Sequence, residues 1–219
     1  MMIGPENFYE MNLKNKNEKE INSVIRGLKN KIGHLKNEIE NPNYEEEFII
    51  HPDKLTQIKC NRLYLKRAKK ALKDIGAVYK PSKKEIFEDD FQKRISDIKE
   101  IKIESMGYLS NKECIAYFED DKVHIKKESL LHNSDDKDND FIHELNKEEF
   151  LEEFSKLYIG EWKKKYSILQ YGNVYIEGIK WTLLITYNDG KTYSIKGDNS
   201  YPYNFNELTD LLCIENFED

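Results

Sequence analysis

Positively charged side chains recur along one segment at a spacing that would gather them on one face of a helix. They are Lys59, Arg62, Lys66, Arg67, Lys69, Lys70 and Lys73. From Lys59 through Arg62 and Lys66 to either Lys69 or Lys70, and on to Lys73, the steps are three or four residues, which places them on a shared face with Arg67 beside it. A cationic stripe of about four turns can follow a phosphate backbone. The segment therefore predicts a nucleic-acid-binding surface. The alternative is a solvated face, or one that docks on the chain's own acidic half.

A second polar stretch lies in a turn between two expected elements near the C-terminus. The turn is Gly197-Asp198-Asn199-Ser200-Tyr201-Pro202, and its candidate partner-binding residues are Asp198, Asn199, Tyr201 and Tyr203. A purely structural turn is the alternative, because Gly and Asn tolerate unusual φ and the residue before Pro is held extended. We expect this turn to contribute at most a protein-binding loop.

Metal and catalytic chemistry find little support in the residue pattern. The alternating acids of residues 136–140 resemble a calcium loop, but that loop needs Gly where Phe141 stands and Glu where Lys147 stands. His132 and His143 flank this run and invite a metal-binding interpretation, whereas His34, His51 and His124 are isolated and show no metal-binding spacing. No Gly-x-Ser-x-Gly elbow and no Gly-rich phosphate loop occurs. We expect no metal, no cofactor and no identifiable catalytic residue, and an enzyme of unrecognised class remains an alternative.

Composition indicates a folded protein with a highly charged surface. Of 219 residues, 38% are hydrophobic and 35% charged, which is too apolar for a disordered chain. The sequence contains no apolar run of about 18 residues, and its first 16 residues lack the apolar core of a signal peptide. We therefore expect a cytoplasmic location and no membrane partner. Three widely spaced cysteines predict reduced thiols.

Charge is distributed unevenly along the chain. Residues 14–84 hold 18 lysines and arginines against 9 acidic residues, whereas residues 85–219 hold 17 against 30. This asymmetry indicates that the basic part meets an anionic partner, or that the two parts attract one another.

Two helices are expected in the first 80 residues. Asn17 and Glu20 form a capping box, and apolar residues then recur at steps of three and four to Ile39, as in a coiled-coil seam. Pro52-Asp53 starts a second helix. Its expected apolar stripe consists of Ile58, Leu65, Ala68, Leu72 and Ile75. The pair predicts an antiparallel, coiled-coil-like helical hairpin over residues 1–80, although the seam fits a homodimer almost as well.

Strand patterns dominate residues 81–219. Alternating apolar residues predict an antiparallel meander of segments 100–105, 113–118 and 122–126. Further on, segments 181–187 and 191–196 predict a β-hairpin around an Asn-Asp-Gly turn.

Helices are expected to flank these strands. The first is short and ends near residue 94. The second starts at residue 147 and is capped by Asn146 and Glu149, and the third is capped by Asn204 and Glu207. The expected fold class is α+β, with the N-terminal hairpin attached to a mostly antiparallel β-sheet body.

The chain also resembles a known family. The carrying motifs are Ile25-Arg26-Gly27-Leu28-Lys29, Ile159-Gly160-Glu161-Trp162 and Gly197-x-Asn199-x-Tyr201-Pro202-x-Asn204-Phe205. They are similar to those of a family of uncharacterised proteins from Gram-positive gut anaerobes and their mobile elements. The resemblance covers nearly the whole chain, least so the central meander. It brings no established activity and no catalytic residues.

The resemblance implies a context in which small proteins bind host machinery without catalysis, anti-CRISPR proteins among them. Together with the charge asymmetry, it predicts a non-enzymatic binding protein that acts on a nucleic-acid-processing complex, such as a CRISPR effector or other nuclease. The alternative is an accessory protein that binds DNA or RNA directly through the basic second helix.

Overall fold

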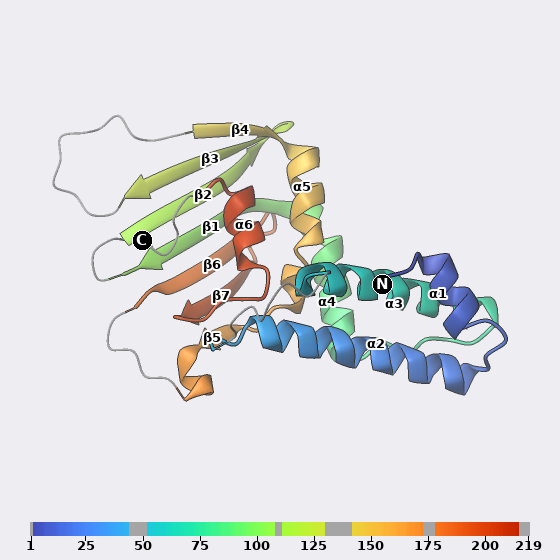
Figure 1. The fold of residues 1–219 in the computed structure, drawn as a ribbon. Coiled ribbons are helices and arrows are strands. Elements are labelled where there is room, and N and C mark those ends of the chain that lie inside the picture. Colours follow the sequence, from blue (N-terminus) through green and yellow to red (C-terminus); the bar gives the residue numbers. More distant parts are fainter. Residues whose placement is uncertain (1, 44–51, 108–110, 130–141, 173–177, 215–219) are drawn as a thin grey trace. The chain divides into compact units, whose positions relative to one another are not determined.

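The computed structural model describes residues 2–43, 52–107, 111–129, 142–172 and 178–214. Within these residues the fold is α+β, with six α-helices and one seven-stranded, mostly antiparallel sheet (Figure 1). The chain divides into two units, Met1–Ser82 and Lys83–Asp219. The first unit is helical and the second holds the sheet.

The described residues of the first unit form three α-helices. They are α1 (Pro5–Asn12), α2 (Glu18–Ile39) and α3 (Lys54–Asp74). The predicted capping box is confirmed, because Asn17 Oδ1 accepts from the Glu20 N–H at 3.1 Å and Glu20 Oε2 accepts from the Asn17 N–H at 2.9 Å. Asp53 caps α3 by accepting from the Thr56 N–H at 2.7 Å. Both long helices therefore begin directly after a residue whose side chain accepts a hydrogen bond from a free N–H of the first turn.

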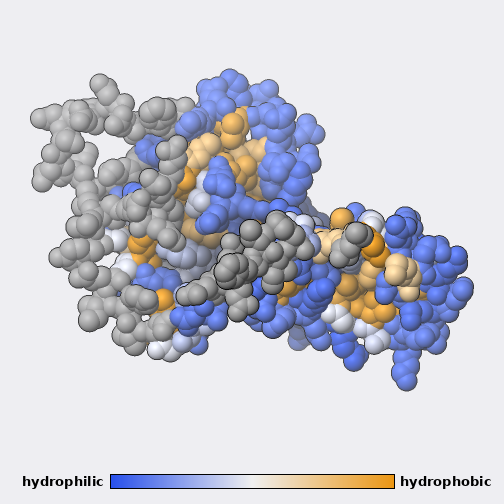
Figure 2. Space-filling view, viewed as in Figure 1, coloured by the Kyte–Doolittle hydropathy of each residue, from blue (hydrophilic) through white to orange (hydrophobic). Residues whose placement is uncertain are grey.

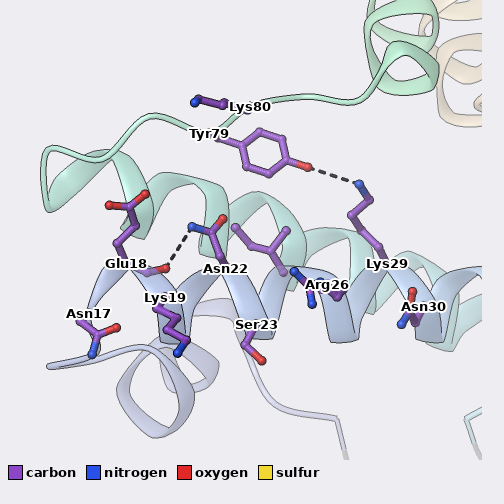
Figure 3. Close-up of a pocket in the computed structure, with 11 residues that line it drawn as sticks. Asn17, Glu18, Lys19, Asn22, Ser23, Arg26, Lys29, Asn30, Tyr79 and Lys80 are labelled. Atoms are coloured by element: carbon purple, nitrogen blue, oxygen red, sulfur yellow. Dashed lines mark hydrogen bonds between the residues drawn. The ribbon is translucent and has the colours of Figure 1, made fainter.

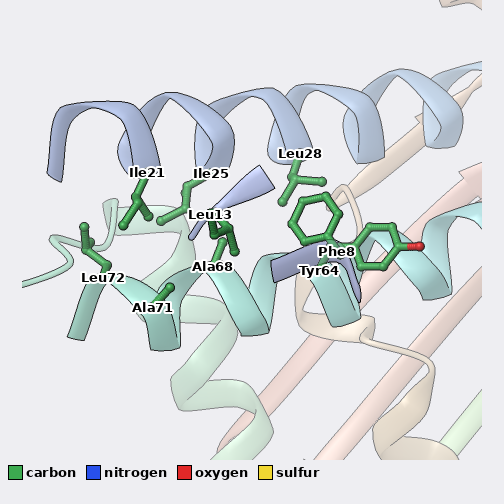
Figure 4. Close-up of a cluster of buried hydrophobic side chains, with 9 residues drawn as sticks. All are labelled: Phe8, Leu13, Ile21, Ile25, Leu28, Tyr64, Ala68, Ala71 and Leu72. Carbon is green, nitrogen blue, oxygen red and sulfur yellow. The ribbon is translucent and has the colours of Figure 1, made fainter. Parts of the chain in front are cut away.

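A buried apolar cluster holds the three helices together (Figure 4). Phe8 of α1 stacks on Tyr64 of α3, with ring centroids 4.2 Å apart. Ala68 is fully buried, and its small side chain lets the helices approach closely. In Figure 2, hydrophilic residues flank a band of hydrophobic ones on the visible side of this unit. The cluster consists of Phe8, Leu13, Ile21, Ile25, Leu28, Tyr64, Ala68, Ala71 and Leu72.

The apolar stripe predicted for α3 needs correction. Ile75 lies beyond the last turn and is half exposed, whereas Asn61 and Tyr64 are buried. Tyr64 combines an apolar ring with a polar tip that packing can satisfy. Its hydroxyl accepts from the Ile3 N–H at 3.0 Å and donates to the Ile3 carbonyl at 2.6 Å. The buried face of α3 is therefore rotated slightly from the expected one.

The sheet runs in the order β4-β3-β2-β1-β6-β7-β5. The predicted meander and C-terminal hairpin are both confirmed, as β1-β2-β3 and β6-β7. They join because β1 also pairs with β6, with Ile101 opposite Ile185. The short β4 and β5 were not predicted, and β5 pairs with β7 in parallel. The strands are β1 (Ile98–Met106), β2 (Asn111–Glu119), β3 (Lys122–Ser129), β4 (Ile142–Asn146), β5 (Lys165–Ser167), β6 (Lys180–Tyr187) and β7 (Thr192–Asp198).

Helices α4 (Lys83–Lys93), α5 (Lys147–Lys156) and α6 (Phe205–Leu211) complete the second unit, together with 3-10 turns at Ile95–Asp97, Ile159–Glu161 and Ile168–Tyr171. Buried residues alternate along β1 and β6, so the sheet has one apolar face. Phe205 of α6 packs on Trp181 of β6, with ring centroids 4.7 Å apart. Helix α6 thus covers part of that apolar face.

The capping box predicted for α6 is wrong. Asn204 makes no side-chain cap to the helix backbone. Its side chain is buried, where its Oδ1 accepts from Trp162 Nε1 and its Nδ2 donates to the Leu157 carbonyl, each at 3.0 Å. The buried indole N–H has no access to water, so it needs a protein acceptor, which the Asn204 amide oxygen supplies.

Gly197 permits a close contact with the buried Trp181 ring. A Cβ built on Gly197 would lie 2.0 Å from Trp181 Nε1 and 2.1 Å from its Cε2. In contrast, a Cβ on Gly27 of α2 would meet nothing within 4 Å.

We expect Gly197→Ala to destabilise the second unit by about 1–3 kcal/mol because the buried indole must move. Gly27→Ala should stabilise α2 by about 0.5–1 kcal/mol, since alanine loses less backbone entropy in a helix. Urea unfolding measures both. Tryptophan fluorescence reports on the second unit, which holds both tryptophans, and circular dichroism reports on the helices. An unchanged midpoint for Gly197→Ala would contradict the packing described for Trp181.

Candidate nucleic-acid interface

The structure divides the seven predicted basic residues of α3 into two groups. Lys59, Lys66, Lys70 and Lys73 are exposed. Arg62, Arg67 and Lys69 are partly buried. The first group therefore forms the accessible part of the predicted surface, which we call the α3 lysine face.

The α3 lysine face lies opposite the buried side of the helix. At about 100° per residue, its four members fall within roughly 60° of one another around the helix axis. Buried Tyr64, Ala68 and Leu72 point the other way. Packing of α3 in the cluster thus turns these lysines outward.

Arg67 serves the internal structure of the first unit. Its Nε donates to both carboxylate oxygens of Glu6, at 3.0 and 3.2 Å, and its guanidinium lies 3.8 Å from the centroid of the Tyr9 ring. Its side chain is 12% exposed. Arg67 therefore fastens α1 to α3, and the sequence offered no sign that Glu6 and Tyr9 would return to this helix.

Lys69 and Arg62 also have neighbours that limit their availability. The Lys69 ammonium lies 4.5 Å from the centroid of the Tyr79 ring, a cation–π contact. Arg62 has its Nε buried. Both belong to the border of the surface rather than to its centre.

The centre of the α3 lysine face carries uncompensated positive charge. Lys66, Lys70 and Lys73 form no ion pair with any other residue that the structure describes. Like charges three and four positions apart on a helix repel one another by about 0.2–0.5 kcal/mol per pair. An anion bound across them would remove this repulsion, which makes the face suited to a polyanion.

The predicted partner-binding turn is well packed. Asn199 adopts φ +48°, and its Oδ1 accepts from the Ile179 N–H at 2.8 Å. Tyr201 stacks nearly parallel on Trp181, with centroids 6.1 Å apart. Tyr203 is only 5% exposed, whereas Asp198 is partly exposed. These contacts give the turn a structural role, and its partner-binding role stays a prediction with Tyr203 as its least accessible member.

The described parts of the chain offer few groups for metal binding or nucleophilic catalysis. They contain no group of three or more His, Cys, Asp or Glu side chains that could hold a metal ion. His132 and the acidic run 136–140 lie outside the described residues. Burial raises the pKa of the Cys114 thiol to about 12, so it stays protonated and is a poor nucleophile.

The different roles of neighbouring basic residues can be tested by charge reversal. We expect Arg67→Glu to destabilise the first unit by about 1–3 kcal/mol, because it places a carboxylate beside Glu6 and leaves partly buried groups unpaired. Lys66→Glu, one residue away but exposed, should change stability by less than about 0.5 kcal/mol. Urea unfolding followed by circular dichroism compares them. Equal effects would contradict the division into internal and accessible residues.

Comparisons with known proteins add no assignment. No family model matches the chain, and neither the curated proteins nor the solved structures yield a match. Among the described residues, no helix combines the length and apolarity needed to cross a bilayer. Function must therefore be inferred from the chemistry of the side chains.

Proposed function

We propose that this chain is a non-enzymatic binding protein whose first unit binds the phosphate backbone of nucleic acid, alone or within a nucleic-acid-processing complex. The observation that carries the proposal is the α3 lysine face, whose four side chains are exposed on the side of the helix away from the apolar cluster. Lysine is a flexible point charge suited to phosphate contact without base readout. Binding would therefore depend on charge rather than on sequence.

A rigid support would strengthen such a surface. We propose that α2 and α3 form the antiparallel, coiled-coil-like hairpin expected from the sequence. The order of side chains supports this, since Ile21 lies across from Leu72 while Leu28 lies near Tyr64 (Figure 4). From Lys59 to Lys73 the face is about 21 Å long at 1.5 Å per residue. That length matches about six base-pair steps of 3.4 Å.

The charges of the two units suit a complex that already holds nucleic acid. The first unit has 16 lysines and arginines against 11 acidic residues, and the second has 19 against 30. A nucleic-acid-processing protein offers an anionic substrate beside a cationic channel, so each unit would find a surface of opposite sign. A CRISPR effector or another nuclease is a partner of this kind, and the resemblance to proteins of mobile elements motivates that choice.

Direct binding of nucleic acid can be tested by charge reversal on the α3 lysine face. We expect the triple variant Lys66→Glu, Lys70→Glu, Lys73→Glu to lose nucleic-acid binding by at least about a hundredfold at about 0.1 M salt, as three phosphate contacts are removed. Fluorescence anisotropy with labelled single-stranded and duplex DNA measures the affinity. A dependence of affinity on salt that is less steep in the variant would confirm the loss of phosphate contacts.

A matched control separates local contact from overall charge. The triple variant Lys83→Glu, Lys99→Glu, Lys180→Glu changes the net charge by the same amount at exposed positions of the second unit. It should retain most of the affinity. If the two triple variants bind equally well, or if the wild-type protein binds no nucleic acid, the α3 lysine face is not a nucleic-acid surface.

Action on a nuclease can be tested in a cleavage assay. In a cleavage assay with a Cas effector from a Gram-positive host, the wild-type protein should slow target cleavage in a dose-dependent way, and the α3 triple variant should do so less. The control triple variant should act as the wild type does. Full cleavage at saturating wild-type protein, with no effector retained in a pull-down, would remove the counter-defence role.

A further inference from the structure

A second polar surface of the first unit lies along α2 and carries no role so far. It is an open groove of about 970 Å³ between one side of α2 and the segment that follows α3 (Figure 3). Its α2 residues, from Glu18 to Asn30, lie on one half of the helix circumference and span about three turns. The groove is lined by Asn17, Glu18, Lys19, Asn22, Ser23, Ile25, Arg26, Lys29, Asn30, Tyr79 and Lys80.

The lining is strongly cationic. It holds four basic side chains, Lys19, Arg26, Lys29 and Lys80, and Glu18 as its acidic one. Arg26, Lys19 and Lys80 are exposed and form no ion pair with any residue in the described ranges. The asparagines and the serine add hydrogen-bonding groups without charge. The groove therefore offers what phosphate and sugar oxygens need.

Tyr79 connects this groove to the border of the α3 lysine face. Lys29 of α2 donates to the Tyr79 hydroxyl at 3.4 Å (Figure 3). Lys69 of α3 lies against the ring of the same tyrosine, 4.5 Å from its centroid. One aromatic side chain thus places cations of both helices side by side.

We propose that the α2 groove is a second phosphate-binding site, which takes the backbone of the strand that the α3 lysine face binds. This inference rests on the proposed function and deepens it. Nucleic acid would then cross the first unit from α3, past Tyr79, to Arg26 and Lys19. The bound strand would contact cations of both long helices.

The arrangement of the cations favours an extended polyanion over a single small anion. Lys19 and Arg26 are seven residues apart on one side of α2, which is about 10 Å along the axis. A site for one phosphate would instead bring its donors together on a single point. Cations spread along an open groove suit successive phosphates of one strand.

Two single variants of α2 test the inference. Arg26→Glu reverses a charge in the groove, and Lys31→Glu reverses one at an exposed position of the same helix outside it. With a labelled single strand of about 12 nucleotides, we expect Arg26→Glu to bind about fivefold more weakly at about 0.1 M salt, the loss of one contact to a single strand. Lys31→Glu should bind as the wild type does. Circular dichroism melts verify that both variants fold.

The outcomes separate this inference from the proposed function. If the α3 triple variant loses binding while Arg26→Glu matches Lys31→Glu, the groove is no phosphate site and the proposed function stands. If Arg26→Glu weakens binding and the α3 triple variant does not, the groove holds the strand and the α3 lysine face does not. Inorganic pyrophosphate titrated in parallel distinguishes the source, since binding as tight as that of the single strand would identify a free phosphate ligand and overturn the inference.

Discussion

The close packing of α2 against α3 is the constraint on which the rest of the first unit depends. Ala68 is fully buried, and its small side chain allows close approach of the neighbouring helix only when α3 turns this face inward. The rotation of α3 about its own axis is thereby fixed. Once Ala68, Leu72 and Tyr64 face the cluster, the lysines at positions 66, 70 and 73 can only face outward. The proposed activity therefore follows from burial, because the same apolar contacts that stabilise the unit determine which charges it exposes.

Helix α1 reduces the part of α3 that is accessible to a ligand. It stacks Phe8 on Tyr64 and brings Glu6 to Arg67, so one flank of α3 is used for internal contacts. Tyr79 performs the corresponding task on another flank through Lys69 and Lys29. Cationic side chains thus serve two purposes in this unit, some as clamps and some as exposed charge. Only the exposed ones are available to a ligand without loss of stability.

The second unit uses part of its acidic surplus within the sheet. On the side of the sheet opposite the buried residues, the Lys102 ammonium lies 2.5 Å from a Glu113 oxygen and 2.8 Å from a Glu104 oxygen. The hydrogen bonds to Glu104 and Glu113 raise the pKa of Lys102. The hydrogen bond from Lys102 lowers the pKa of Glu104. The contacts with Glu104 in the same strand and with Glu113 in β2 stabilise the charged form of Lys102, and the first of them stabilises that of Glu104.

Local patterns in the sequence determined most elements of this protein. Capping at Asn17 and Asp53, the seam of α2 and the alternation of β1 and β6 are short-range signals, because each depends on residues a few positions apart. Tertiary structure alone decided the rest. Asn204 turned to a buried indole instead of its helix, β4 and β5 joined the sheet through distant partners, and Arg67 left the basic stripe for Glu6, 61 residues away. Spacing shows which side chains share a helical face, but only the packing of other elements against that helix decides which of them remain exposed.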